Sequence, residues 1–190
     1  EKEDTEYLIE NANDTVDNHM QFVEERVLAI RHNTTIQSFY GNINLNQENA
    51  KKLGCFLGIR THTALSLIVE TGDFKRFAKG NTYAAFLGLA PGEHSSSTNV
   101  NRLGISKAGN THLRCLLIEA AKGICKGAIG HKSKALRSRQ SGQAAGVIAY
   151  ADKANTRLRG KYYKMLRHGK KKNVAVAAVA RELACFVWGM

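Results

Sequence analysis

A serine-rich segment near the middle of the chain holds the side chains best suited to chemistry. Ser95, Ser96 and a third serine follow His94, and Arg102 and Lys107 lie a few residues further on. A serine hydroxyl becomes a good nucleophile only when a base or a nearby positive charge eases the loss of its proton. A phosphodiester under attack also needs cations to stabilise its developing charge. The combination predicts serine chemistry on a phosphodiester, and a polar surface turn is the alternative.

Two predicted helices flank this segment and would position it. The apolar stretch 83–87 predicts a short helix that ends at Gly88. After the segment, Asn110 or Thr111 can cap a second helix. The apolar face of that helix recurs at helical spacing and comprises Leu113, Leu116, Leu117, Ala120 and Ile124. We therefore expect the serines on a loop between two helices.

A hairpin of helices is predicted upstream, over residues 53–70. A glycine turn at Gly58 joins a short helix to a second helix that opens near Thr63. Backbone N–H groups and the helix dipole at such a turn can hold one phosphate without reading sequence. We therefore predict nucleic-acid contacts at Gly58 and Arg60, and an ordinary helical corner is the alternative.

The first fifty residues predict one long helix, spanning residues 5–40 and ending at Gly41. Four apolar residues keep a strict seven-residue repeat: Ile9, Val16, Val23 and Ile30. This repeat is typical of a coiled coil with a partner helix. A helix that packs on its own domain explains the same stripe, so both interpretations remain open.

Charge is divided unevenly along the 190-residue chain, whose net charge is +12. Residues 1–50 hold ten acidic and three basic side chains, a balance of −7, whereas residues 51–190 hold six and twenty-five, a balance of +19. So basic a region attracts polyanions, of which nucleic acid is the commonest. Lys170, Lys171 and Lys172 precede an apolar helix predicted over residues 174–188, where cations oppose the helix dipole. An external phosphate therefore explains these lysines better than helix stability does.

Other features of the sequence exclude whole classes of protein. No apolar run approaches the roughly 20 residues needed to cross a bilayer, and the N-terminus lacks a signal-peptide pattern. We therefore expect a soluble, cytoplasmic protein with no membrane partner. The four cysteines lack the close Cys or His pairing of a zinc site and are expected to be buried thiols. We predict no metal site and no cofactor in this chain.

Taken together, these motifs resemble the C-terminal domain of the IS110 family of insertion-sequence transposases (IS110, IS116 and IS902 type). The matching motifs, in matching order, are Phe86-Leu87-Gly88-Leu89-Ala90-Pro91, His94-Ser95-Ser96, the stretch from Arg102 to Asn110, and Leu113-Arg114. The resemblance covers about residues 53–190. The family pattern has two glycines where this chain has Ser97 and Thr98.

The resemblance implies a DNA recombinase in which a serine of this domain attacks DNA. By position that serine is Ser96, with Ser95 as the other candidate. Arg102 and Lys107 would hold phosphate or transition-state charge, and Arg114 would contact the DNA backbone. The resemblance also implies a preceding acidic, RNase-H-like domain that holds Mg²⁺, a guide (bridge) RNA that selects DNA, and assembly into dimers or tetramers.

The predicted fold class is all-α, with negligible strand content. A coiled-coil-like segment over residues 1–50 would precede a basic helical domain over residues 51–190 that contains a helix-hairpin-helix-like element. The predicted function is the serine-bearing domain of a DNA transposase, inactive by itself. The alternative is a helical module that only binds DNA or RNA. A third interpretation makes the acidic N-terminal helix a docking arm for a protein partner.

Overall fold

The computed structural model of the protein describes residues 46–96 and 99–190. The long helix predicted over residues 5–40, its coiled-coil pairing and its docking role lie outside these residues. The elements are, in order, a helix over residues 46–53, α3 (Thr61–Thr71), the 3₁₀ helix η1 (Phe74–Arg76), α4 (Gly80–Phe86), β1 (Pro91–Ser96), β2 (Asn99–Ile105), α5 (Thr111–Cys125), α6 (Lys134–Gln140), α7 (Ala145–Arg167) and α8 (Lys172–Trp188).

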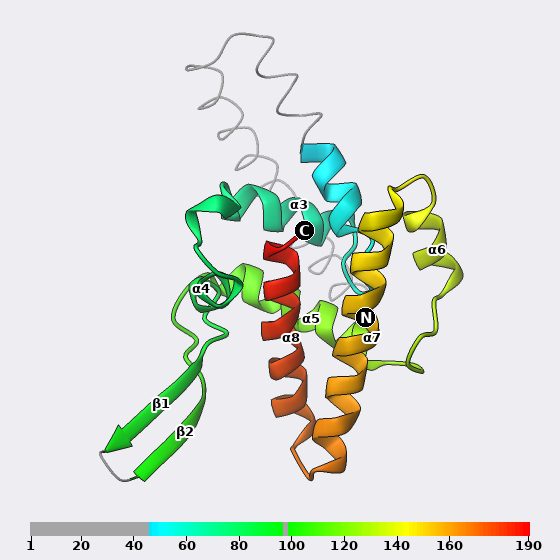
Figure 1. Cartoon of the computed structure of the whole chain (residues 1–190). Helices are drawn as coiled ribbons and strands as arrows, with labels where there is room; N and C mark the ends of the chain where they lie inside the picture. The colour runs from blue at the N-terminus through cyan, green and yellow to red at the C-terminus, as the bar shows by residue number, and fades with distance from the viewer. Residues whose placement is uncertain (1–45, 97–98) are drawn as a thin grey trace, which may run out of the picture. The chain divides into compact units, whose positions relative to one another are not determined.

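Helix α8 forms the centre of the helical domain. Its sequence is apolar around most of its circumference, so neighbouring helices must cover it. Helices α4, α5 and α7 all pack against it, and Figure 1 shows it between α4 and α7. Fully buried small side chains at Ala175, Ala180 and Ala184 let these neighbours approach closely. The apolar helix predicted over residues 174–188 is confirmed as α8.

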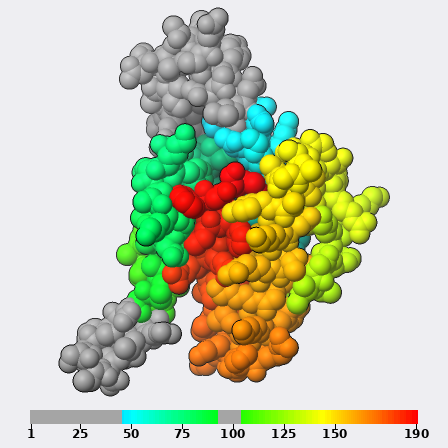
Figure 2. All heavy atoms as spheres, viewed as in Figure 1, coloured from blue at the N-terminus to red at the C-terminus, as the bar shows by residue number. Residues whose placement is uncertain are grey.

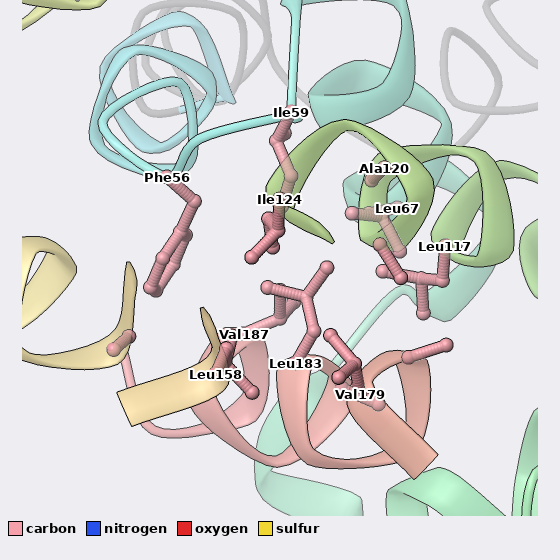
Figure 3. Close-up of a cluster of buried hydrophobic side chains, with 14 of the residues drawn as sticks. Phe56, Ile59, Leu67, Leu117, Ala120, Ile124, Leu158, Val179, Leu183 and Val187 are labelled. Atoms are coloured by element: carbon pink, nitrogen blue, oxygen red, sulfur yellow. The ribbon is translucent and has the colours of Figure 1, made fainter. Parts of the chain in front are cut away.

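The core lies where α3, α5, α7 and the turn after residue 53 meet α8. Figure 3 shows the buried side chains that interlock there: Phe56, Ile59, Leu67, Leu117, Ala120, Ile124, Leu158, Val179, Leu183 and Val187. On α5 the predicted apolar face is confirmed, with Leu116 half-buried and the rest buried. None of the helices among the described residues is long and apolar enough to span a membrane.

The mostly helical class is confirmed, with one local exception. The serine-rich segment is an antiparallel hairpin of β1 and β2, where a loop between helices is predicted. The cluster of Ser, Thr, Asn and Gly residues is typical of a turn and hides the strand signal. The hairpin exists because cross-strand backbone hydrogen bonds satisfy both segments, which local composition does not reveal.

Candidate nucleic-acid interface

The β hairpin is fixed at its base to the ends of α4 and α5. Three backbone hydrogen bonds join its two legs: Ser106 N–H to the Ala90 carbonyl at 2.8 Å, Lys107 N–H to the Gly88 carbonyl at 3.1 Å, and Asn110 N–H to the Phe86 carbonyl at 3.0 Å. The Asn110 side chain also accepts a hydrogen bond from the Leu113 N–H at 2.9 Å and so caps α5 as predicted. The hairpin therefore extends from a defined mount.

Two glycines allow the legs of the hairpin to approach each other closely. Gly88 and Gly109 have φ values of +68° and +128°, which side-chain-bearing residues rarely adopt. A Cβ atom at Gly109 would lie 2.1 Å from the Phe86 carbonyl oxygen, and one at Gly88 would lie 2.7 Å from that of Ala108. Only glycine fits at these two positions with the observed backbone.

The strand register places both candidate nucleophiles at the end of β1. Ser96 pairs with Asn99 and Ser95 pairs with Val100, on either side of residues 97–98. Both serines therefore stay candidates for the nucleophile.

The predicted cations of the hairpin occupy different parts of it. Arg102 pairs with Glu93 across the strands. Lys107 follows the end of β2, where its backbone has a φ of +58° and its side chain is exposed. Lys107 therefore belongs to the mount of the hairpin, several residues from Ser96 along the strands.

Arg114 lies inside the domain, whereas a contact with the DNA backbone was predicted and would need an exposed side chain. Its side chain is buried, and its guanidinium donates to the Leu87 carbonyl at 3.2 Å and to Thr111 Oγ1 at 2.9 Å. It also lies against Gly88, where an added Cβ atom would come within 2.5 Å of Arg114 Nη1. Arg114 thus braces the base of the hairpin, and we assign it no phosphate contact.

We expect Arg114→Met to lower the free energy of unfolding by about 2 kcal/mol, because the buried Leu87 carbonyl would lose its donor. Urea titration followed by the fluorescence of Trp188, the single tryptophan, measures this. Arg137→Met, at an exposed residue of α6, should stay within about 0.5 kcal/mol. Unchanged stability together with a weaker salt dependence of DNA binding would instead restore the phosphate contact.

The turn at Gly58 packs against α5. With a φ of +88°, Gly58 leaves so little space that an added Cβ atom would lie 2.3 Å from the Ala120 carbonyl oxygen. This contact explains the glycine without a phosphate, as the helical-corner interpretation predicts. Arg60 is exposed and occupies the N-cap position of α3 without a capping side-chain hydrogen bond. The exposed part of the turn is therefore Arg60 and the first turn of α3.

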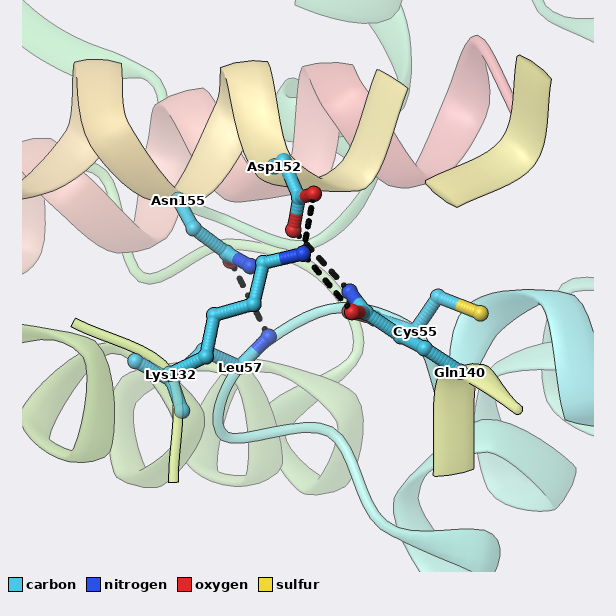
Figure 4. A network of polar contacts seen from close by, with 6 residues as sticks. All are labelled: Cys55, Leu57, Lys132, Gln140, Asp152 and Asn155. Carbon is cyan, nitrogen blue, oxygen red and sulfur yellow. Dashed lines mark hydrogen bonds and ion pairs between the residues drawn. The ribbon is translucent and has the colours of Figure 1, made fainter. Parts of the chain in front are cut away.

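A polar network fixes this turn to α6 and α7 (Figure 4). The Leu57 N–H donates to Asn155 Oδ1 at 3.0 Å, and the Gln140 amide donates to the Cys55 carbonyl at 3.2 Å. Gln140 is itself bonded to Asp152 and Lys132, which form an ion pair with each other. The Leu57 N–H is therefore used within the domain.

Arg159, in the basic region of the chain, is a second buried arginine. Its guanidinium donates to four backbone carbonyls at 2.6–2.9 Å, those of Ile124, Lys126, Ala128 and His131. These bonds hold the connection between α5 and α6 against α7. Nothing in the local sequence distinguishes this arginine from exposed ones, because its acceptors come from another segment.

The three lysines before α8 are exposed, as predicted for an anion contact. Lys171 is the N-cap residue and Lys172 the first residue of α8, whose first turn contains no acidic side chain. Positive charge at a helix N-terminus opposes the helix dipole. An anion bound there would relieve this repulsion, so Lys170, Lys171 and Lys172 remain candidate phosphate contacts.

Three cations form a row on α7 that the sequence analysis did not identify. Lys153, Arg157 and Lys161 follow one another at four-residue spacing, which places them on one side of the helix. Arg157 and Lys161 both form ion pairs with Glu182 of α8. The four-residue spacing is the signal that could have found this row.

The cysteines are more varied than predicted. Cys55 and Cys125 are buried, and burial raises the pKa of both thiols, that of Cys125 to about 11. Cys115 is exposed and Cys185 half-buried, so the prediction of four buried thiols is wrong for these two. Among the residues that the structure describes, no group of three or more His, Cys, Asp or Glu side chains could hold a metal ion.

Fold and surface together define a basic, mostly helical domain that carries a serine-bearing hairpin. Residues 50–136 match the model of the family described as "Transposase IS116/IS110/IS902 family". The matched region includes the hairpin, and the resemblance noted above is confirmed.

Three relatives support the same assignment. The chain is 38% identical over 133 residues to "Putative transposase y4qE" of Sinorhizobium fredii, covering 70% of this chain and 34% of the relative. It is 38% identical over 79 residues to "Transposase for insertion sequence element IS1111A" of Coxiella burnetii, covering 42% and 22%. It is 34% identical over 97 residues to "Probable family 20 transposase" of Pseudomonas aeruginosa, covering 50% and 29%. The matches thus span about a third or less of each relative.

Proposed function

We propose that this chain is the serine-bearing domain of a DNA transposase that cleaves and exchanges DNA strands. The observation that carries the proposal is the position of Ser95 and Ser96 on a hairpin inside the family region, on a domain with a strong excess of positive charge. A domain with this charge binds the DNA backbone through phosphate contacts and counterion release.

The proposed reaction is a transesterification at phosphorus. The Ser96 hydroxyl loses its proton as its oxygen bonds to phosphorus, one phosphorus–oxygen bond to a sugar breaks, and the departing sugar oxygen takes up a proton. The product is a phosphoserine ester, which a hydroxyl of another DNA end resolves by the reverse reaction. Arg102 would stabilise the charge that develops on the phosphate oxygens, and Lys107, at the mount of the hairpin, would hold another phosphate of the strand. His94 would accept the serine proton.

The remaining parts of the proposal concern the whole transposase. We propose an acidic, RNase-H-like domain that holds Mg²⁺, a guide RNA that selects DNA, and a dimer or tetramer acting in the cytoplasm. Because the relatives are about three times as long as the matched region or longer, they have room for such a domain.

DNA binding by the 190-residue chain tests the charge argument directly. Changing Lys170, Lys171 and Lys172 together to Gln should weaken duplex binding and reduce the slope of log K against log salt by about two to three, because each phosphate contact contributes about 0.9. Fluorescence anisotropy over a range of salt concentrations gives the slope.

The control for this experiment is Lys122→Gln, which removes a lysine that is paired with Glu119 on α5. Its slope should change by less than about 0.5. An unchanged slope in the triple variant would show that these lysines do not contact phosphate.

A further inference from the structure

Two neighbouring grooves beside α8 form one continuous surface path. The first, of about 520 Å³, lies along α7 and α8 and includes Tyr150 and Lys153. The second, of about 550 Å³, lies between α8 and the base of the hairpin and includes Lys107. Lys161 and Arg181 line both, so the grooves meet there. Figure 2 shows part of α8, in red, exposed between α7 and the segment around α4.

The first part of the path is lined by cations at regular spacing. Lys153, Arg157 and Lys161 are separated by four residues each, or about 6 Å along the helix axis, and Arg181 joins them from α8. The step of about 6 Å is longer than the rise of about 3.4 Å per nucleotide in a stacked strand, so it suits a strand whose bases are unstacked and whose backbone is extended. The row therefore matches a nucleic-acid backbone in charge, and its repeat favours an unpaired strand.

A single carboxylate, Glu182, holds two of these cations in place. It accepts hydrogen bonds from Arg157 and from Lys161, the latter at 2.6 Å. Burial works to raise the pKa of Glu182, but these hydrogen bonds outweigh it and keep the pKa below its usual value. The carboxylate thus stays charged at neutral pH, and four cations against one anion leave this part of the groove positive.

Aromatic and apolar surfaces lie next to the charges. Tyr150 and Phe186 line the first part, with their rings in an edge-to-face arrangement at 5.6 Å. The second part is lined by Leu89, Ile105 and Val174, with the amide of Asn173 beside them. A cationic track with aromatic and apolar surfaces is the arrangement by which proteins bind unpaired strands, because each exposed base has an apolar face.

We propose that this groove binds an unpaired DNA strand and leads it to the hairpin. Phosphates would contact the α7 cations and Arg181, and bases would rest on Tyr150, Phe186 and the apolar surface beside Val174. A duplex covers its base faces by stacking, so it could not use that surface. The inference rests on the proposed function for its choice of DNA, because the groove ends at the base of the strands that carry the serines.

Four single variants of the 190-residue chain test this proposal in matched pairs. Lys153→Glu, in the groove, is compared with Lys134→Glu, at an exposed lysine of α6, so the net charge is the same. Val174→Asp, in the groove, is compared with Ile129→Asp; the two apolar side chains are 51% and 52% exposed. Aspartate in the first turn of α8 suits the helix dipole, so folding should be kept.

Anisotropy with a labelled 15-nucleotide DNA strand, its duplex and the same sequence as RNA gives the result. Each groove variant should raise the Kd for the unpaired DNA at least about fivefold, with a change below about twofold in its control. For the duplex, each groove variant and its control should raise the Kd by the same factor. If a groove variant and its control raised the Kd for the unpaired DNA by the same factor, the proposal would be overturned. Tighter binding of the RNA than of the DNA, weakened by the groove variants, would overturn it as well.

This test is separate from the test of the serine chemistry. Ser96→Ala should bind the unpaired strand with nearly unchanged Kd, because a serine hydroxyl contributes little beside the cations of the groove. If the groove variants weaken binding but strand exchange survives both serine changes, the serine chemistry is contradicted and the binding groove is supported. If the serine changes abolish strand exchange but the groove variants do not weaken binding, the serine chemistry is supported and the binding groove is contradicted.

Discussion

Changing Ser96 to alanine should reduce strand cleavage by at least about a thousandfold in a full-length transposase that contains this chain. Removal of a nucleophile that forms a covalent intermediate leaves only the contributions of binding and charge stabilisation, and such losses reach about a millionfold in other enzymes. DNA binding should stay unchanged, because a serine hydroxyl contributes little beside the cations of the domain. Cleavage of a labelled DNA end and trapping of the protein–DNA ester measure the effect.

The neighbouring serine provides the informative comparison. Ser95 pairs with Val100, next to the pair of Ser96 with Asn99. Because Ser96 is the proposed nucleophile, we expect Ser95→Ala to keep most of the activity. Ser138→Ala, on an exposed turn of α6, controls for the loss of any serine. If both hairpin variants exchange strands normally, the binding-only module becomes the correct interpretation.

The second large effect is expected at Gly109. Alanine there would have to adopt a φ of +128°, and its Cβ atom would lie 2.1 Å from the Phe86 carbonyl oxygen. The backbone strain and the overlap with a main-chain atom together should lower the free energy of unfolding by about 3 kcal/mol or more. Urea titration with Trp188 fluorescence is suitable, because the Trp188 indole is bonded to the Phe77 carbonyl inside the helical domain.

Gly130→Ala separates the two causes of this loss. Gly130 also has a positive φ, +79°, but an added Cβ atom would meet nothing within 4 Å. This control should lose only about 1 kcal/mol, the cost of the strained backbone alone. Equal losses at the two positions would contradict the close approach of the hairpin legs.

A partial loss at Gly109 would also be informative. If Gly109→Ala keeps the stability of the helices but abolishes cleavage, the hairpin mount serves mainly to aim the serines. If stability and cleavage fall together, the mount is part of the domain core. Strand cleavage measured at a temperature where the variant is folded distinguishes these outcomes.

The helical framework was predictable from the sequence because its signals are local. Apolar periodicity marks the buried face of α5, Asn110 marks its beginning, and the apolar run from Val174 marks the buried α8. The family motifs could also be identified from the sequence, because they depend only on the order and spacing of residues 86–114. The fold class and the family resemblance could therefore be predicted, because short stretches of the chain contain the information for both.

The roles of single polar residues were decided by tertiary structure. Arg114 and Arg159 look like exposed cations in the sequence, yet both guanidinium groups bind backbone carbonyls inside the domain. Gly58 looks like a phosphate turn, yet it makes room for the Ala120 carbonyl of α5. The partners in these contacts lie about 25 to 60 residues away along the chain, so no local pattern specifies them. A charge or a glycine shows its function only when the fold brings its partner beside it.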